Sequence, residues 1–173
     1  MIPYGPDAHL TYRKEENRMK IATLGIIIEN EKLLLGEKKK GEIGTGRLSG
    51  PGGKLDQGET LEECLVRETR EELEIDLDPN SLELVAVIDF YAAGEIDFRV
   101  YVYRAKILSG EIHETADMIP GWYTATEETF KRTYESDQHW LPQAARGEKF
   151  NANVYYEKRA EGFLNIEFLP FAP

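Results

Sequence analysis

Runs of β-branched and aromatic residues, separated by turn-forming residues, dominate the pattern of this chain. They predict strands at residues 21–28, 33–37, 82–91, 97–107, 120–123, 154–157 and 163–168. Helical periodicity predicts helices at 59–74, 127–130 and 137–145, the last with Asp137 as its N-cap. Because strands and helices are mixed along the chain, we predict an α/β fold, an α/β/α sandwich with helices on both faces of a mixed β-sheet.

The first predicted helix carries acidic residues on its apolar side. A period of 3.6 residues places Leu61 and Leu65, with Cys64 and Ile75, in one stripe. The same stripe contains Glu68, Glu71 and Glu72. A Glu-rich run is usually a solvated helix face, but that interpretation does not explain why these glutamates share a stripe with leucines.

Three carboxylates on a buried face require compensation. Each costs on the order of several kcal/mol when it is charged and unpaired, and the three repel one another at their i, i+3 and i+4 spacings. A divalent cation removes both problems because it supplies positive charge at that place. Oxygen ligands favour a hard ion, so the helix predicts a Mg²⁺ site that Mn²⁺ could also occupy.

The spacing of the charged residues is more specific than the helix itself. Gly53 is followed after five residues by Glu59, after seven more by Arg67-Glu68, and then by Glu71-Glu72. This segment resembles the Nudix box, G-x5-E-x7-R-E-U-x-E-E-x-G-U, in which U is a bulky apolar residue. The resemblance implies the Nudix fold and a metal-dependent phosphoanhydride hydrolase.

Two positions of the box depart from this pattern. Thr69 stands at an apolar position, where its methyl group can still pack. Glu74 replaces the second glycine, which would normally end the helix. We therefore expect a less sharp helix end, extending as far as the residue before Pro79.

The resemblance also implies roles for the box residues. Glu68 and Glu72 would be the central metal ligands, and Glu71 would share the metal site or act as the general base. Gly53 would offer its backbone carbonyl to the metal. Arg67 would orient the carboxylates by a bidentate contact, although an ordinary i, i+4 ion pair is compatible with this role.

Other charged residues are open to two interpretations. Glu59 either ligates the metal or simply favours the helix dipole. Lys38 and Lys39 either meet the substrate phosphates or belong to a solvated loop. By resemblance, an acidic residue near the metal site is expected from the segment before Trp122, with Asp117 as the candidate and Glu114 as its rival.

The composition of the chain limits the kinds of molecule that it is expected to bind. The chain has 173 residues, 41% of them hydrophobic, and a net charge of −11, which disfavours binding of a nucleic-acid polymer. A metal ion can still bridge an acidic protein to a small phosphate ester. The single cysteine, Cys64, excludes an internal disulfide, is expected to pack as a small hydrophobe, and is consistent with a cytoplasmic protein. No stretch is long and apolar enough to span a membrane.

We expect a single Nudix domain over residues 20–173 and a flexible N-terminal leader over 1–19. The domain is expected to be a monomer or a homodimer. His113 and His139 lack metal-type spacing and are expected to have no catalytic part.

A weaker resemblance extends over roughly residues 20–168. The segments 34–54, 118–122 and 130–142 are similar to the MutT-like oxidised-purine nucleoside triphosphatases of mammals. The resemblance implies that Tyr134 stacks on the base and Asp137 hydrogen-bonds its edge. This chain has Tyr134 where those enzymes have tryptophan, Ser136 for the first of two acidic residues, and Ser49 for an asparagine that contacts the base.

The predicted reaction is hydrolysis of an oxidised purine (d)NTP, such as 8-oxo-dGTP, to the monophosphate and pyrophosphate, which would sanitise the nucleotide pool. One alternative is a dinucleoside polyphosphate hydrolase, for which Tyr91 after the box is a weak signal. The absence of proline in 85–93 disfavours an ADP-ribose hydrolase. A nucleotide-sensing domain without catalysis and an acidic protein-interaction domain are further alternatives.

Overall fold

The computed structural model describes residues 19–41 and 43–173, so the predicted leader lies outside the described residues except for Met19. Nine strands form one sheet in the order β11-β10-β6-β7-β1-β2-β3, with β4 paired to β1 and β9 paired to β2. Their bounds are β1 Lys20–Glu29, β2 Lys32–Lys38, β3 Leu48–Ser49, β4 Gly52–Lys54, β6 Glu83–Ala92, β7 Glu95–Ala105, β9 Met118–Tyr123, β10 Phe150–Lys158 and β11 Glu161–Leu169. The pairs β1–β7 and β6–β10 are parallel and the others antiparallel, so the predicted mixed sheet is confirmed.

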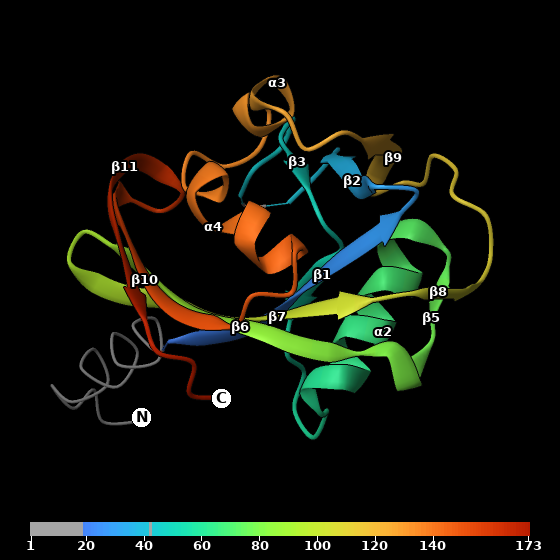
Figure 1. The fold of residues 1–173 in the computed structure, drawn as a ribbon, viewed down its shortest axis with the longest axis horizontal. Coiled ribbons are helices and arrows are strands. Elements are labelled where there is room, and N and C mark those ends of the chain that lie inside the picture. The colour runs from blue at the N-terminus through green and yellow to red at the C-terminus, as the bar shows by residue number, and fades with distance from the viewer. Residues whose placement is uncertain (1–18, 42) are drawn as a thin grey trace, which may run out of the picture.

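Helices cover both faces of this sheet. Helix α2 (Leu61–Leu73) lies on one face, and α3 (Glu127–Lys131) and α4 (Asp137–Ala145) lie on the other (Figure 1). Side chains alternate along a strand, so adjacent residues of β1 pack into two hydrophobic cores on opposite faces of the sheet. Ile27 packs with Leu65 of α2, and Ile26 packs with Trp140 of α4. The α/β/α sandwich predicted from the sequence is confirmed.

The middle of the sheet positions the box. Strand β1 pairs with β4 over Ala22–Leu24 and with β2 only at Ile28 and Glu29. Between them, the backbone N–H of Gly25 donates to the carbonyl of Pro51 at 2.8 Å. Because β1 pairs with β4 at one end and with β2 at the other, the short strand β4 lies beside α2. The glycines of β4 therefore meet the acidic side of the helix.

Several boundaries differ from those predicted. The strand expected at 97–107 is interrupted into β7 and β8 (Ile107–Ser109), and β8 pairs with β5 (Asp76–Leu77) in a separate two-stranded sheet. The 3-10 turn η1 (Pro79–Ser81) and the short strands β3, β4 and β5 were not predicted, because two or three residues carry no periodicity. The last two strands are longer than expected.

Helix α2 begins and ends sharply. Thr60 is its N-cap in a capping box with Glu63, so the helix starts after the predicted Glu59. Glu74 adopts the left-handed conformation at φ 55° and donates its N–H to the Arg70 carbonyl. The prediction of a helix extending toward Pro79 is therefore wrong. Glu74 takes the glycine's conformation because the next residue, Ile75, is buried in the core and because His113 pairs with the Glu74 carboxylate.

The predicted N-cap of α4 is also wrong. Ser136 occupies the cap position and makes no side-chain capping bond, while Asp137 is the first helical residue. The Asp137 carboxylate instead accepts a hydrogen bond from the backbone N–H of Tyr134 at 3.2 Å. Asp137 is thereby turned toward the interior.

Candidate active site

Arg67 is the centre of a network of carboxylates on α2. Its Nε and Nη2 atoms donate to the two oxygens of Glu59 at 2.7 and 3.0 Å. Its Nη1 atom donates to Glu68 at 2.8 Å and, more weakly, to Glu71 at 3.3 Å. Both the bidentate contact and the i, i+4 pair considered from the sequence therefore exist, with Glu59 as the bidentate partner.

Glu59 pairs with Arg67 in the structure, a contact that neither interpretation from the sequence included. Its hydrogen bonds from Arg67 and from the backbone N–H of Asp56 hold the pKa of Glu59 down at about 2. The Arg67–Glu59 pair also extends to the Lys54 carbonyl, which accepts from Arg67 at 3.1 Å. Glu59 thus anchors Arg67 to β4, and Arg67 in turn holds the carboxylates beyond it.

Glu68 sits directly against Gly53. A Cβ atom on residue 53 would lie 2.4 Å from the Glu68 carboxyl carbon, so any larger residue would push this side chain away. The Glu68 side chain is 17% exposed. Burial raises the pKa of Glu68 despite its contact with Arg67. The glycine is therefore required for close approach of the β4 backbone to Glu68.

Glu72 is the most deeply placed acid of the box. Its Oε1 atom accepts the backbone N–H of Gly52 at 2.8 Å. Burial raises the pKa of Glu72 to about 7, the Gly52 N–H and the charge of Lys38 oppose this shift, and the charges of Glu68 and Asp117 add to it. Asp117 therefore lies within electrostatic reach of Glu72.

Glu71 does not lie on the buried side of α2. Its side chain is 57% exposed, so the prediction that all three glutamates share the buried stripe is wrong for this residue. The apolar arc is narrower than the sequence pattern indicated, and Glu71 lies at its solvent edge. It remains attached to the other carboxylates through Arg67.

The donor set suits a divalent metal chemically, although it is not gathered in advance. Among residues 19–41 and 43–173, no three acidic, histidine or cysteine side chains converge on one point as metal ligands would. Glu68 and Glu71 turn to Arg67 and Glu72 turns to Gly52 instead. Burial raises the pKa of both Glu68 and Glu72, which shows that nearby positive charge does not compensate them fully. Oxygen donors with uncompensated charge fit Mg²⁺ or Mn²⁺.

A cavity of about 430 Å³ opens beside these carboxylates. Glu72, Gly52, Gly53, Lys38 and Lys54 line the part next to the box. Aromatic and aliphatic side chains line most of the rest, including Leu24, Phe90, Phe98, Trp140 and Tyr156. A pocket that is mainly apolar with a few polar groups is typical of a site for a small organic ligand, and this volume is sufficient for a nucleotide-sized molecule.

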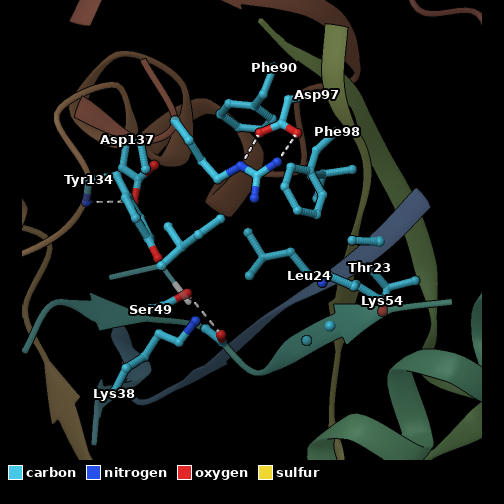
Figure 2. A pocket seen from close by; sticks show the side chains of 18 of the residues that line it. Thr23, Leu24, Lys38, Ser49, Lys54, Phe90, Asp97, Phe98, Tyr134 and Asp137 are labelled. Atoms are coloured by element: carbon cyan, nitrogen blue, oxygen red, sulfur yellow. Dashed lines mark hydrogen bonds and ion pairs between the residues drawn. The ribbon is translucent and has the colours of Figure 1, made fainter. Parts of the chain in front are cut away.

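Tyr134 and Asp137, predicted from the sequence to bind the base, both line this cavity (Figure 2). The Tyr134 ring packs over Gly44, where a Cβ atom would lie 1.9 Å from the hydroxyl oxygen, and Arg47 lies 5.9 Å from the ring centroid. Burial raises the pKa of Asp137 to about 7, against the opposing effect of the Tyr134 N–H. The carboxyl group can thus be protonated or ionised near neutral pH.

The two lysines that were predicted as phosphate contacts have different surroundings. Lys38, at the end of β2, lines the cavity, whereas Lys39 does not. Lys39 donates to Glu114 at 2.7 Å and to the Thr115 carbonyl at 3.0 Å. Glu114 thus pairs with Lys39, whereas the charge of Asp117 acts on Glu72. Asp117 also pairs with Lys40 at 2.8 Å.

Ser49 lines the cavity from β3, and its hydroxyl donates to the Gly50 carbonyl at 3.1 Å. Trp140 also contributes to the cavity wall, and it is 2% exposed as a core residue of α4. Cys64 is fully buried and is a free cysteine, not part of a disulfide. Burial raises the pKa of its thiol, so Cys64 packs as the predicted small hydrophobe. Neither His113 nor His139 lines the cavity.

Sequence reasoning missed the wall opposite Tyr134. Asp97 and Arg159 line the cavity there and form an ion pair, with both hydrogen bonds at 2.6 Å. The two residues are 62 positions apart and lie near the ends of different hairpins. No local spacing rule joins them, and only the parallel pairing of β10 with β6 brings their hairpins together.

Comparison with known proteins agrees with this geometry. The NUDIX domain family model matches residues 19–144. The oxidized purine nucleoside triphosphate hydrolase of Danio rerio is 33% identical over 132 residues, which are 76% of this chain and 83% of that protein. The enzyme of the same name from Mus musculus is 32% identical over 139 residues, which are 80% and 87% of the two chains.

Solved structures show the same fold. The crystal structure of a mutator MutT protein from Bacillus halodurans superposes with a TM-score of 0.74 at 19% identity, covering 87% of this chain and 97% of that one. In the described part of the chain, no helix has the length and apolar character needed to cross a membrane. With the box geometry and the family match together, the chain belongs to the Nudix family as a MutT-like hydrolase of phosphoanhydride bonds.

Proposed function

We propose that this enzyme hydrolyses a nucleoside triphosphate, with an oxidised purine (d)NTP such as 8-oxo-dGTP as the preferred class, to the monophosphate and pyrophosphate. The observation that carries the proposal is that one and the same cavity joins Glu72 and Gly53 of the box to Tyr134 and Asp137. One end suits phosphates and the other suits a base. The names of the two curated relatives support the same substrate class, and a cytoplasmic role in sanitising the nucleotide pool is part of the proposal.

At the phosphate end, Glu68 and Glu72 would hold Mg²⁺, with Glu71 and the Gly53 carbonyl as further ligands. When bound, the ion would neutralise phosphate charge and lower the pKa of a water molecule. Arg67 donates to both Glu68 and Glu71 and so holds these two carboxylates beside each other. Lys38 lines the same part of the cavity and would meet a phosphate oxygen. In the alternative in which Glu71 does not ligate the ion, its exposed carboxylate at the edge of the site would act as the general base.

At the base end, Tyr134 supplies the stacking surface and Asp137 the polar contact. Stacking is worth roughly 1–3 kcal/mol and discriminates little between bases. Asp137 can donate a hydrogen bond when it is protonated and accept one when it is ionised. Because burial raises the pKa of Asp137 to about 7, both forms are accessible at neutral pH. Ser49, shorter than an asparagine, would reach the base only through water.

The test is release of pyrophosphate and phosphate from a substrate panel with Mg²⁺. The panel contains 8-oxo-dGTP, 2-hydroxy-dATP, the normal NTPs and dNTPs, diadenosine tetraphosphate and ADP-ribose. We expect preferential pyrophosphate release from an oxidised dNTP. Turnover of only the dinucleotide would favour the role of Tyr91, which lines the cavity and stacks on Tyr155 at 4.9 Å. No turnover with either Mg²⁺ or Mn²⁺ would favour a nucleotide sensor.

Replacement of the stacking ring should weaken substrate binding. We expect Tyr134→Ala to raise KM by roughly 5- to 150-fold, the range of base stacking, and to change kcat much less. Tyr134→Phe is the matched control, because it keeps the ring and removes only the hydroxyl group. Steady-state kinetics of both variants check this, with thermal unfolding to verify the fold. An unchanged KM in Tyr134→Ala would remove this residue from the base site.

A further inference from the structure

The buried hydroxyl group of Tyr156 is bonded to the segment that carries both predicted base contacts. Tyr156, in β10, is 4% exposed, and Ser136, just before α4, is fully buried. The Tyr156 hydroxyl oxygen accepts the backbone N–H of Ser136 at 3.0 Å, and the hydroxyl group donates to Ser136 Oγ at 2.9 Å. A buried hydroxyl group is costly unless it is hydrogen-bonded, and both of these bonds reach the same residue.

Ser136 lies inside a closed turn of residues 134–137. The backbone N–H of Asp137 donates to the Tyr134 carbonyl at 3.0 Å. In return, the backbone N–H of Tyr134 donates to the Asp137 carboxylate at 3.2 Å. The ring proposed to stack on the base and the carboxyl group proposed to bind its edge therefore belong to one unit. A group that holds Ser136 in place holds both of them.

The β10–β11 hairpin lies beside the start of α4 and also contacts this region at the surface (Figure 1). The backbone N–H of Phe163 donates to the Glu135 carboxylate at 3.1 Å, and the Phe163 ring stacks on His139 with centroids 4.9 Å apart. Glu135 and His139 are exposed, so water competes for these contacts. The two bonds of Tyr156 are buried, and their loss would leave the Ser136 N–H without a partner away from water.

Packing alone does not require a hydroxyl group at residue 156. The Tyr156 ring belongs to the same core as Trp140 and meets Phe163 edge-on at 5.8 Å between centroids. A phenylalanine would fill the same space. Burial raises the pKa of Tyr156, so the hydroxyl group keeps the proton that it donates to Ser136. The hydroxyl group is thus explained by the turn that it holds.

We propose that Tyr156 is a positioning residue for the base site. It acts through Ser136 and holds the turn of residues 134–137 in the orientation in which both predicted base contacts line the cavity. This inference rests on the proposed function, because it assumes that a nucleobase binds against this turn. It also gives a reason for serine at residue 136, since the Ser136 hydroxyl is bonded inside the fold.

Tyr156→Phe tests the proposal, because it keeps the ring and removes only the hydroxyl group. We expect KM for 8-oxo-dGTP to rise about tenfold, the effect of losing roughly one hydrogen bond to the base. The carboxylates of the box do not contact this turn, so kcat should change much less. Thermal unfolding should show a Tm lower by roughly 2–12 °C, because the Ser136 N–H loses its acceptor. A lower Tm with an unchanged KM would show a purely structural role and overturn the proposal.

A double-mutant cycle tests whether Tyr156 acts through Ser136. Ser136→Ala removes Oγ but leaves the backbone N–H bonded to Tyr156, so it should raise KM less than Tyr156→Phe does. The double variant should have the KM of Tyr156→Phe alone, because changes within one contact are not additive. If the two effects on KM instead multiplied, the two residues would act independently and the proposal would fail.

Tyr103→Phe is the matched control. Tyr103 is 3% exposed, and its hydroxyl group donates to Glu62 at 3.0 Å. It belongs to the core on the other face of the sheet and does not line the cavity. This variant should therefore keep the KM of the wild type. A rise in KM as large as that of Tyr156→Phe would show that loss of any buried hydroxyl group has this effect, which would contradict the proposal.

Binding of the product makes the result independent of catalysis. Calorimetric titration with 8-oxo-dGMP measures base binding without hydrolysis. If the wild type hydrolyses no triphosphate but binds 8-oxo-dGMP about tenfold more tightly than Tyr156→Phe does, the proposed function fails and this inference stands. Equal affinities of the two proteins would overturn the inference even if oxidised nucleotides are hydrolysed. A wild type that binds neither 8-oxo-dGMP nor any nucleotide of the panel would overturn both.

Discussion

Glu72→Gln is expected to lower kcat/KM by about three orders of magnitude, which corresponds to roughly 4 kcal/mol of transition-state stabilisation. The glutamine has the same shape, and its carbonyl oxygen can still accept the Gly52 N–H that Glu72 accepts at 2.8 Å. The change therefore removes charge and leaves the local hydrogen bond in place. The expected loss comes from weaker binding of the divalent ion that Glu68 and Glu72 are proposed to hold.

The same substitution should not weaken the metal-free fold. Burial and the neighbouring Glu68 raise the pKa of Glu72 to about 7, so at pH 8 the folded protein holds an unfavourable charge there. A neutral glutamine removes that cost, and the Tm without metal is expected to equal or exceed that of the wild type. Loss of activity with retained stability would therefore separate a catalytic role from a structural one.

Mg²⁺-dependent pyrophosphate release and thermal unfolding with EDTA measure the two quantities. Glu62→Gln is the matched control on the same helix, because its amide oxygen can keep the 3.0 Å hydrogen bond from the Tyr103 hydroxyl. Glu62 does not line the cavity, so this variant should keep its activity. If Glu72→Gln retained nearly full hydrolysis, the assignment of Glu72 as a metal ligand would be wrong.

The parts of the site that could be predicted are those coded by short-range spacing. Arg67 follows Glu59 by eight positions, about two helical turns, which is how the box brings the two side chains together. Gly53 could likewise be marked as a place of close backbone approach, and the structure shows what approaches it, Glu68. The strands followed from their β-branched runs, and the helices on both faces of the sheet followed from the mixture of strands and helices along the chain.

The parts that could not be predicted depend on tertiary contacts. Glu74 adopts a left-handed backbone conformation that a glutamate disfavours. It does so because Ile75 must enter the core and because His113 pairs with the Glu74 carboxylate. The periodicity of α2 gave the correct side for Glu68 and Glu72 but placed Glu71 in the buried arc, although its side chain is 57% exposed. The pairing of Asp97 with Arg159 depends on sheet order, and no sequence window contains both residues.

Asp137→Asn should make the protein more stable, and the gain should increase with pH. The folded pKa of Asp137 is raised by burial to about 7, against a reference value of 3.8. The folded state thus binds a proton that the unfolded state has already released between these values, and its stability falls as pH rises through that window. The neutral, protonated form is favourable below the window, and above about pH 7 the folded protein carries a buried charge.

Asparagine at this position carries no titrating group, so its advantage over the wild type should grow by about 2–3 kcal/mol between pH 5 and pH 8. Its side-chain oxygen can still accept the Tyr134 N–H that Asp137 accepts at 3.2 Å. Urea denaturation of both proteins without metal at pH 5 and pH 8 measures the difference between their free energies of unfolding. The titration of Glu72 is common to both proteins and cancels from that difference. Asp78→Asn is the control, because asparagine can also cap the Asn80 N–H at the surface.

A constant difference across this range would show that Asp137 is not held in a raised-pKa environment. The stability effect and the proposed recognition of the base have the same origin. Burial beside Trp140 and Tyr134 makes the ionised carboxylate costly to the fold, and it also lets the carboxyl group donate a hydrogen bond near neutral pH. A variant that is more stable at pH 8 should therefore show an altered pH dependence of KM, since asparagine cannot change between donor and acceptor by titration.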